Sequence, residues 1–317
     1  MMADAFIFDI YRGTTHDGPG CRSTVFFKGC PLSCEWCHNP EGIPPKQQVW
    51  WDSRACIGCM LCHKACKTGA NIPGKAGIVV NETLCVRCGA CVRACPAKAM
   101  TFIGEEWPLD KLIDEVMRGK AYYDKTGGGV TASGGECMLQ HRFIAEFFRE
   151  LHSRGVDTAL DTCGFVPYSA FEEVLPYTDH MLYDLKLFDG DLHKKFTGQD
   201  NRQILENVKR ISKAISAGAV SADLWIRTPV IPGATATVEN ITAIGKFITE
   251  ELGGAVSRWE LCAFNNSCIT KYERLHLTWP YRRTPLIDCK TSRLLRKAAV
   301  DGGVNEDIVA VTGLISE

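Results

Sequence analysis

The fold of this chain is decided near its N-terminus by the stretch Val25-Phe-Phe-Lys-Gly29-Cys30-Pro-Leu-Ser-Cys34-Glu-Trp-Cys37-His-Asn-Pro40. Most residues of Ser23–Lys28 are β-branched or aromatic, which predicts a strand that ends in a glycine turn. The turn delivers three cysteines, and three close thiolates suit an iron–sulfur cluster. A cubane cluster has four irons, so three cysteines leave one iron open to a substrate or cofactor. We therefore predict a reaction centre at Cys30, Cys34 and Cys37.

The composition argues against two classes of partner. The 317 residues carry a formal net charge of −1, so nothing suggests a nucleic-acid footprint or a membrane-surface protein. No apolar run approaches the roughly 20 residues that are needed to cross a bilayer. With 45% hydrophobic residues, the chain can build one large core plus an insert, or two domains.

Cysteine usage indicates metal chemistry in a reducing compartment. The chain has 17 cysteines, and its first residues lack the basic region and long apolar core of a secretion signal. We therefore expect metal ligands rather than disulfides. Because exposed clusters are oxidised readily, we expect a cytoplasmic protein that works at low oxygen.

A second cysteine region repeats one spacing. Its runs are Cys56-Ile-Gly-Cys59-Met-Leu-Cys62-His-Lys-Ala-Cys66 and Cys85-Val-Arg-Cys88-Gly-Ala-Cys91-Val-Arg-Ala-Cys95. Each run has the spacing of a bacterial ferredoxin half, and in such pairs the fourth cysteine of each run binds the other cluster. The pattern predicts two further four-iron clusters, one held by Cys56, Cys59, Cys62 and Cys95 and the other by Cys85, Cys88, Cys91 and Cys66.

Zinc is the alternative for both cysteine regions. The N-terminal loop could be a zinc knuckle completed by His38 or by a distant cysteine. Two zinc sites in the second region would need eight tetrahedral ligands at a duplicated ferredoxin spacing by chance. Eight cysteines satisfy two cubanes completely, so these clusters have no open iron and are expected to transfer electrons.

After Ile103 the chain alternates between strand and helix patterns, which indicates a parallel sheet with right-handed crossovers. We predict an α/β fold, a partial (β/α)6 TIM-like barrel over residues 1–49 and 103–317. An α+β domain like a bacterial 2[4Fe–4S] ferredoxin is inserted over residues 50–102. The expected helices are Pro108–Tyr123, Phe143–Arg154, Ser169–Leu175, Arg202–Ala217 and Val238–Glu251, and the expected strands include Ala5–Tyr11, Asp157–Thr162, His180–Leu187, Ala222–Val230 and Arg258–Phe264.

Polar residues gather where the predicted strands end. In βα barrels the C-terminal ends of the strands carry the active site. The cysteine loop follows one strand, and the same position on others is taken by Ser133–Glu136, Asp161, Asp184 and Asn265. Arg227 also lies at a strand end, and either a site role or an ordinary ion pair fits it.

The Cys30, Cys34 and Cys37 spacing is similar to that of the radical S-adenosylmethionine (radical SAM) enzymes. The longer string from Asp17-Gly-Pro-Gly20 to Trp36-Cys-His-Asn39 resembles one subfamily, the glycyl radical enzyme activating enzymes. Thr126-Gly-Gly-Gly-Val-Thr-Ala-Ser-Gly-Gly-Glu136 and Asp184-Leu-Lys186 resemble two further signatures of that subfamily. The match runs from about Phe6 to about Tyr272 and includes the ferredoxin-like insert.

The resemblance implies roles for individual residues. The open iron of the Cys30, Cys34 and Cys37 cluster would chelate the amino and carboxylate groups of S-adenosylmethionine. Residues matching the family's cofactor contacts are Gly134, Gly135 and Glu136 for the amino group, Asp161, Thr162 and Asp184 for a monovalent cation, and Lys186 for the carboxylate. Asp17 and Arg22 belong to a loop that, in the family, faces the target glycine of the partner.

One stretch departs from the family pattern. The family often has Pro-Tyr/Phe-His after the sixth strand, with the histidine near the nucleoside, whereas this chain has Cys262-Ala-Phe264-Asn265-Asn266. The Asn265 amide can donate and accept hydrogen bonds but cannot titrate. Asn265 is therefore a candidate contact to the nucleoside without acid–base chemistry.

The predicted function is to cleave S-adenosylmethionine reductively and to abstract a hydrogen from a glycine of a partner glycyl radical enzyme. The expected cofactors are three [4Fe–4S] clusters, S-adenosylmethionine and a monovalent cation. We expect the protein to be a monomer. A flavodoxin or ferredoxin would supply its electrons. One alternative is a radical SAM enzyme that acts on a small molecule or peptide with auxiliary clusters. The other is a multi-cluster electron carrier without catalysis.

Overall fold

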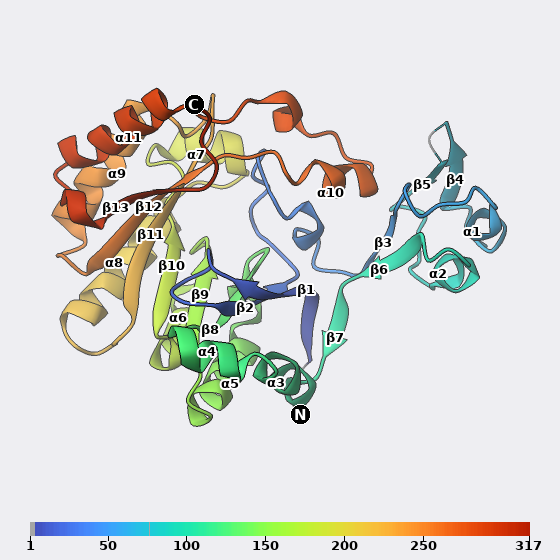
Figure 1. The fold of residues 1–317 in the computed structure, drawn as a ribbon, viewed down its shortest axis with the longest axis horizontal. Helices are drawn as coiled ribbons and strands as arrows, with labels where there is room; N and C mark the ends of the chain where they lie inside the picture. The colour runs from blue at the N-terminus through green and yellow to red at the C-terminus, as the bar shows by residue number, and fades with distance from the viewer. Residues whose placement is uncertain (1–3, 76) are drawn as a thin grey trace.

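The structure is a computed structural model that describes residues 4–75 and 77–317. Its centre is a nine-stranded sheet in the order β13-β12-β11-β10-β9-β8-β2-β1-β7 (Figure 1). The strands are β1 (Ala5–Thr14), β2 (Arg22–Phe27), β7 (Glu105–Trp107), β8 (Gly129–Gly134), β9 (Asp157–Thr162), β10 (His180–Asp184), β11 (Asp223–Val230), β12 (Val256–Ala263) and β13 (Val309–Thr312).

Most of this sheet is parallel. Every neighbouring pair from β2 through β8, β9, β10, β11 and β12 to β13 runs parallel. Strand β1 is antiparallel to both β2 and β7. Parallel neighbours need crossover connections, which the helices provide. The carboxyl ends of the parallel strands therefore lie at one edge, where the sequence predicts the site.

Amphipathic helices supply these crossovers and pack against the sheet. In α5 the buried side chains recur at helical spacing: Phe143, Ile144, Phe147, Phe148 and Leu151. Figure 1 shows the helices outside the sheet. They are α3 (Leu109–Met117), α4 (Lys120–Thr126), α5 (His141–Ser153), α6 (Tyr168–Val174), α7 (Gly190–Thr197), α8 (Arg202–Ser216), α9 (Val238–Glu251) and α11 (Cys289–Asp301).

The single helix predicted over Pro108–Tyr123 is wrong, because the structure has two helices there. Helix α3 ends before Arg118 and α4 begins after Gly119. The Tyr123 hydroxyl donates to the carbonyl oxygen of Val116 at 2.7 Å. A Cβ on Gly119 would overlap the Tyr123 ring, so this close approach requires the glycine and fixes the break. Helix α7 has no counterpart among the helices expected from the sequence.

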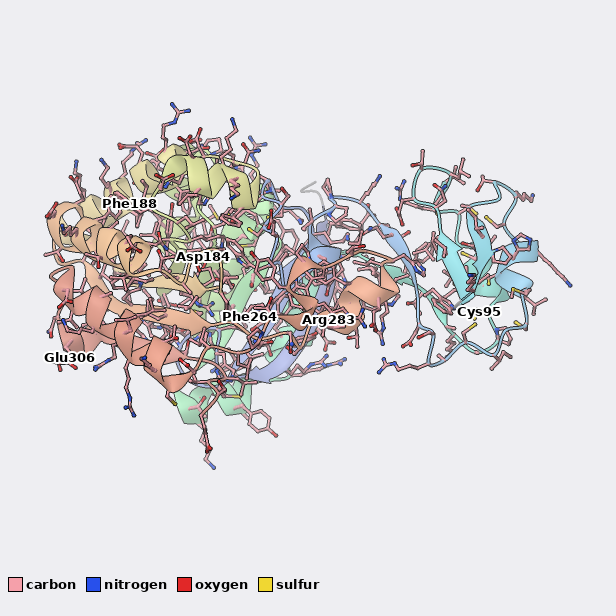
Figure 2. All side chains as sticks on the ribbon, turned by 90° about the horizontal axis from the view of Figure 1, so that it is seen from above. Cys95, Asp184, Phe188, Phe264, Arg283 and Glu306 are labelled. Atoms are coloured by element: carbon pink, nitrogen blue, oxygen red, sulfur yellow. The ribbon has the colours of Figure 1, made fainter. Side chains whose placement is uncertain are left out.

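The second cysteine region forms a separate lobe beside the sheet (Figure 2). Its entry strand β3 (Gln48–Trp51) pairs antiparallel with its exit strand β6 (Met100–Ile103). Strands β4 (Asn71–Gly74) and β5 (Gly77–Val80) form a second pair, and the cysteine runs lead into α1 (Leu61–Lys64) and α2 (Ala90–Ala94). A small core of its own holds the lobe together, made of Val49, Trp51, Cys62, Ile78, Cys91, Ala99 and Met100.

Across the described residues, the helices are all too short or too polar to span a lipid bilayer.

Candidate active site

A cavity of about 880 Å³ is lined by the cysteine loop and by residues of strands β8 to β13. Pockets of roughly 300–1,000 Å³ typically hold small molecules and cofactors. The cavity extends from the cysteine loop to the loop of residues 15–20. Most of the predicted site residues line it, namely Cys30, Cys34, Cys37, Gly134, Gly135, Asp161, Thr162, Asp184, Lys186 and Asn265.

The cysteine loop is held from two sides by backbone contacts. The amide nitrogens of Ser33 and Glu35 donate to the carbonyl oxygens at the C-terminal end of α7, at 2.8 and 3.0 Å. On the other side, the hydroxyl of Tyr272 donates to the carbonyl oxygen of Cys37 at 2.8 Å. These bonds fix three sulfur atoms at one end of the cavity without using the thiols themselves.

Two of the three thiols are buried so deeply that the thiolate form needs a neighbouring positive charge. Burial raises the pKa of Cys34 to about 12, and burial also raises the pKa of Cys37. A hydrogen bond with the Cys163 thiol lowers the pKa of Cys30. Buried thiolates need a compensating positive charge, which metal coordination supplies. The donor set is three soft sulfur ligands, and it therefore fits an iron–sulfur cluster.

The zinc alternative with His38 finds no support in the geometry. The His38 ring packs edge-on against Phe264 and Trp279, each at 6.2 Å between ring centres. Within residues 4–75 and 77–317, no three His, Cys, Asp or Glu side chains converge as the ligands of one ion would. In a cubane each cysteine binds a different iron, so its ligands are spaced more widely.

Two glycines let the end of β8 lie against the cysteine loop. The amide of Gly135 donates to the carbonyl oxygen of Phe27 at 2.9 Å. A Cβ on Gly134 would overlap the backbone of Phe27, and one on Gly135 would overlap the carbonyl oxygen of Gly29. Any side chain here would push β8 away from the cysteines. The Gly-Gly pair is thus required by close backbone approach at the cavity wall.

The carboxylate of Glu136 points away from the cavity that Gly134 and Gly135 line. It is fully buried and does not line the cavity. It accepts hydrogen bonds from the Thr162 hydroxyl at 2.8 Å and from the amides of Met138 and Cys163 at 3.0 and 2.7 Å. Burial nevertheless raises the pKa of Glu136. The Glu136 carboxylate therefore joins the end of β8 to the end of β9.

Asp161, Asp184 and Lys186 bring charge to the floor of the cavity. Asp161 accepts a hydrogen bond from the Ser133 hydroxyl at 2.6 Å, and burial raises the pKa of Asp161 to about 6. The Lys186 ammonium pairs with the Asp184 carboxylate. Burial opposes the charge on Lys186, but Asp184 and the thiols outweigh it and raise the pKa of Lys186. Lys186 therefore stays cationic beside the cysteine loop.

Two further residues belong to this charged floor: Glu260, which no sequence pattern indicates, and Arg227, for which the sequence allows either a site role or an ordinary ion pair. Asp184, Arg227 and Glu260 are paired in register across β10, β11 and β12. Arg227 lies 3.4 Å from Asp161 Oδ1 and 3.5 Å from Glu260 Oε2. Arg258 pairs with the other Glu260 oxygen at 2.8 Å. A row of alternating charges therefore crosses the sheet. It results from the register between the strands and not from the spacing of these residues in the sequence.

Asn265 lines the cavity just beyond β12. Its Oδ1 accepts a hydrogen bond from the Ser267 amide at 3.1 Å, and its NH₂ group has no hydrogen-bond partner among residues 4–75 and 77–317. Neighbouring Phe264 is buried in an aromatic cluster with Trp36, Trp279 and Tyr281. These aromatic side chains fix the backbone that carries Asn265; Phe264 is labelled in Figure 2.

The resemblance places Arg22 in a loop that faces the target glycine of the partner, and in the structure Arg22 begins β2. Its side chain is fully buried. The guanidinium donates to Thr131 Oγ1 at 2.8 Å and to the carbonyl oxygens of Pro19 and Val130 at 3.1 and 3.0 Å. Arg22 also pairs with Asp157 at 2.7 Å. It therefore holds the loop of residues 15–20 in place from behind.

Asp17 lies in that loop and is also tied to the sheet. Its carboxylate accepts a hydrogen bond from Thr24 Oγ1 at 2.7 Å, and its carbonyl oxygen accepts one from Thr131 Oγ1 at 2.7 Å. Residues on both sides of Asp17 line the cavity: Thr15, His16, Gly18, Pro19 and Gly20. The loop therefore borders the cavity at the end away from the cysteines.

The insert contains a second, smaller sulfur-lined space. A cavity of about 30 Å³ is bordered by Trp51 and by four cysteines, Cys56, Cys59, Cys62 and Cys95. These are the four that the ferredoxin spacing assigns to one cluster. In the other set, Cys91 is buried near Cys85, and the Cys66 thiol lies 3.6 Å from the Thr68 hydroxyl. The cysteine that crosses between runs, Cys95, thus lies beside the first run.

Two family profiles and one solved structure resemble parts of this chain. The profile of the Radical SAM superfamily matches residues 85–241, and the profile of a 4Fe-4S dicluster domain matches residues 55–100. A domain of a pyruvate-formate lyase-activating enzyme from Bacteroides vulgatus superposes with a TM-score of 0.47 at 23% identity, over 59% of this chain and 100% of that one.

Characterised relatives share most of the chain. The (2S)-3-sulfopropanediol dehydratase activating enzyme of Klebsiella oxytoca is 37% identical over 281 residues, which are 87% of this chain and 86% of that one. The trans-4-hydroxy-L-proline dehydratase activating enzyme of Clostridioides difficile is 38% identical over 271 residues, 85% of this chain and 87% of that one. The chain therefore belongs to the glycyl radical enzyme activating enzymes, within the radical SAM superfamily.

Proposed function

We propose that this protein installs a radical on a glycine of a partner glycyl radical enzyme and consumes S-adenosylmethionine in doing so. The observation that carries the proposal is one continuous cavity between the three loop cysteines and the loop around Asp17. When bound, a four-iron cluster supplies the electron that cleaves S-adenosylmethionine to methionine and the 5′-deoxyadenosyl radical, which takes the glycine hydrogen.

The residues of the chain position and shield that chemistry. Cys30, Cys34 and Cys37 would hold the cluster, and the cationic Lys186 would bind the methionine carboxylate beside it. Asp161, Thr162 and Asp184 are proposed to bind a monovalent cation, with support from their shared place on the cavity wall. The Asn265 amide would contact the nucleoside. Enclosure by the sheet keeps water from the reacting atoms.

Gly134 and Gly135 are proposed to present backbone groups to the methionine amino group. Support comes from their place on the cavity wall and from the absence of side chains there. Backbone carbonyl oxygens can accept from an ammonium without adding a charge to the site. Glu136 would act only indirectly, by holding the end of β8.

We also propose the division of the chain. A partial (β/α)6 barrel would comprise residues 1–49 and 103–317, and a ferredoxin-like domain residues 50–102. The proposed cofactors are three [4Fe–4S] clusters, one at the loop cysteines and two in the insert. The paired neck strands β3 and β6 support the boundaries, and the Trp51-lined cavity supports one insert cluster.

The proposed partners are a glycyl radical enzyme and a flavodoxin or ferredoxin donor, with the activating enzyme acting as a cytoplasmic monomer. The relatives named above activate dehydratases for a sulfonated diol and for hydroxyproline.

An anaerobic assay of S-adenosylmethionine cleavage tests the proposal. Reconstituted protein with dithionite is expected to release 5′-deoxyadenosine and methionine in equal amounts. A Cys34→Ala variant should lose this activity, because it removes one of only three ligands of the catalytic cluster, whereas Cys289→Ala, at an exposed thiol, should keep it. Absence of cleavage by the wild type, or full cleavage by Cys34→Ala, would overturn the proposal.

A further inference from the structure

One segment after β12 lies between the cysteine loop and the insert. We call residues Cys268–Tyr281 the bridging segment; it contains α10 (Ile269–Arg274) and the start of the short helix η4 (Pro280–Arg283). Figure 1 shows α10 between the sheet and strands β3 and β6, and Figure 2 shows the region around Arg283 between the two lobes. Its contacts on both sides show what it joins.

Aromatic side chains of the bridging segment hold the catalytic cysteine loop. Besides the bond from Tyr272 to Cys37, the indole nitrogen of Trp279 donates to the carbonyl oxygen of Glu35 at 3.1 Å. The rings of Tyr272 and Trp279 stack at 5.1 Å and 16°. These two residues therefore fix the backbone on either side of Trp36.

A cationic side chain adds a third attachment on this side. Lys271 donates to Asn39 Oδ1 at 2.7 Å and pairs with Glu41 at 2.7 Å. The Glu41 side chain is almost fully buried, so this pair is shielded from solvent screening. The bridging segment thus grips the cysteine loop along residues 35–41.

The same segment also grips the insert. Arg274 donates to Asp52 Oδ2 at 2.6 Å, and its guanidinium lies 4.7 Å from the centre of the Trp50 ring. The His276 ring stacks on the indole of Trp51, with centres 5.8 Å apart and planes at 14°. The bridging segment therefore contacts three consecutive residues of the insert, Trp50, Trp51 and Asp52. The contacts are a cation–π contact, a ring stack and an ion pair.

Trp51 connects this docking surface to one particular cluster site. The Trp51 side chain borders the small cavity that Cys56, Cys59, Cys62 and Cys95 also line. It is 5% exposed and packs so tightly that a Cβ on Gly77 would overlap its ring. One face of Trp51 thus meets the bridging segment while another part of the ring borders the sulfur-lined space. The four other cysteines of the insert do not border that cavity.

We propose that the bridging segment docks the insert on the catalytic loop and that the cluster site of Cys56, Cys59, Cys62 and Cys95 is the proximal one. This inference rests on the proposed function, in which both sites carry four-iron clusters. One electron from a reduced flavodoxin or ferredoxin passes through the insert and across the Trp51–His276 contact to the Cys30, Cys34 and Cys37 site. The donor loses one electron and the catalytic site gains one.

Magnetic relaxation tests which insert site is proximal, independently of turnover. A reduced cluster relaxes faster in electron paramagnetic resonance when a second reduced cluster is close. The matched variants are Cys56→Ala/Cys59→Ala and Cys85→Ala/Cys88→Ala, which remove equivalent ligands of the two runs. The first pair is expected to slow relaxation of the catalytic cluster strongly, and the second pair to leave it near the wild-type rate. The reverse order, or equal effects, would overturn the assignment.

Reduction kinetics test the bridging contacts. In an Arg274→Gln/His276→Leu variant with full iron content, we expect reduced flavodoxin to reduce the catalytic cluster about tenfold more slowly than in the wild type. The control is Arg283→Gln, at an exposed arginine of η4, which should reduce at the wild-type rate. An unchanged rate in the double variant would contradict the role of the bridging segment.

A small reductant separates this inference from the proposed function. Dithionite can enter the cavity without using the insert, so the double variant should cleave S-adenosylmethionine normally with dithionite. Normal cleavage together with an unchanged flavodoxin rate would refute only the bridging role. Loss of cleavage in the wild type itself would refute the proposed function.

Discussion

At the scale of single residues, the cavity floor is a row of buried charges whose partners come from different strands. Arg227 is the centre of this row. Burial opposes its charge, but Cys262, Asp161, Asp184 and Glu260 outweigh burial and raise the pKa of Arg227. Removing one partner of a buried ion pair leaves the other charge uncompensated. Each member therefore matters through the position that it imposes on its neighbours.

Glu260→Gln tests this row at a residue that has no predicted contact with the cofactor. The change keeps the shape but removes the charge opposite Arg227, so the guanidinium should shift toward Asp161. We expect S-adenosylmethionine to bind about 5- to 30-fold more weakly, a loss of about 1–2 kcal/mol. Equilibrium binding to reconstituted protein measures the effect. Glu206→Gln, on the outside of α8, is the control, and equal affinities of the two variants would contradict the account.

Glu136 belongs to a family signature, and its carboxylate accepts hydrogen bonds from Thr162, Met138 and Cys163. Glu136→Gln replaces an acceptor of three hydrogen bonds by a group whose NH₂ must face a donor. We expect the free energy of unfolding to fall by about 1–3 kcal/mol while folded protein still binds S-adenosylmethionine. Anaerobic urea unfolding, with exposed Glu105→Gln as the control, measures it. Unchanged stability combined with lost binding would instead indicate direct contact.

At the scale of elements, different interactions hold the two ends of the parallel strands. Close backbone packing holds the C-terminal end, and ion pairs hold the N-terminal end. At the C-terminal end, Gly134 and Gly135 bring β8 against the cysteine loop. At the N-terminal end of the parallel strands, His180 of β10 pairs with Asp157 of β9 at 3.0 Å and lies 3.5 Å from Asp223 of β11. One edge forms the site, and the other ties three strands together.

Gly135→Ala tests the first edge. The added Cβ would overlap the Gly29 carbonyl oxygen and displace the turn just before Cys30. We expect the variant to incorporate less iron at the catalytic site and to lose most S-adenosylmethionine cleavage. The control is Gly127→Ala, where the Cβ meets open space and only the positive φ of 67° adds strain, costing about 1 kcal/mol. Iron content and cleavage equal to those of the control would contradict the packing argument.

The second edge predicts a pH dependence of stability. Burial opposes the charge on His180, but hydrogen bonds to Asp157 and Asp223 outweigh it and raise the pKa of His180 to about 9. Since the folded pKa lies above the unfolded one, the stabilisation is complete below about pH 6.5 and is lost as the pH rises through 9. Partial exposure reduces the expected loss to about 1–2 kcal/mol.

Urea unfolding between pH 6 and 10 measures this loss. The difference in the free energy of unfolding between the wild type and His180→Gln isolates the contribution of His180. Arg22 and both aspartates are present in each protein. Exposed His16→Gln is the control and should follow the wild-type curve. If the free energies of unfolding of the wild type and His180→Gln differed by the same amount at every pH, the result would contradict the account.

At the scale of the whole molecule, the sequence predicted those features that depend on local chemistry. The cysteine spacing and the Gly-Gly signature predicted the iron–sulfur chemistry and the family, and the match with characterised relatives confirms the family. The strand pattern placed Asp161 and Asp184 at strand ends, where the structure also has them. Short-range patterns carry these features because neighbours along the chain determine them.

Features that depend on strand register and packing could not be predicted from the sequence. Glu260 joins the site because β11 and β12 pair Arg227 with Glu260, which no spacing reveals. Arg22 looks like a surface residue of a glycine-rich loop, yet the fold buries it against β8. The bridging segment has no motif, since its partners lie more than 200 positions away in the sequence, as Asp52 and Cys37 do.

Isotope transfer tests the central claim most directly. The protein is incubated with S-adenosylmethionine, a reductant and the glycyl radical enzyme encoded nearest to it, produced with glycine deuterated at Cα. The account predicts a glycyl radical signal in electron paramagnetic resonance and 5′-deoxyadenosine that carries one deuterium per radical formed. Cleavage of S-adenosylmethionine in which the deoxyadenosine carries no deuterium, and the partner shows no radical, would contradict it.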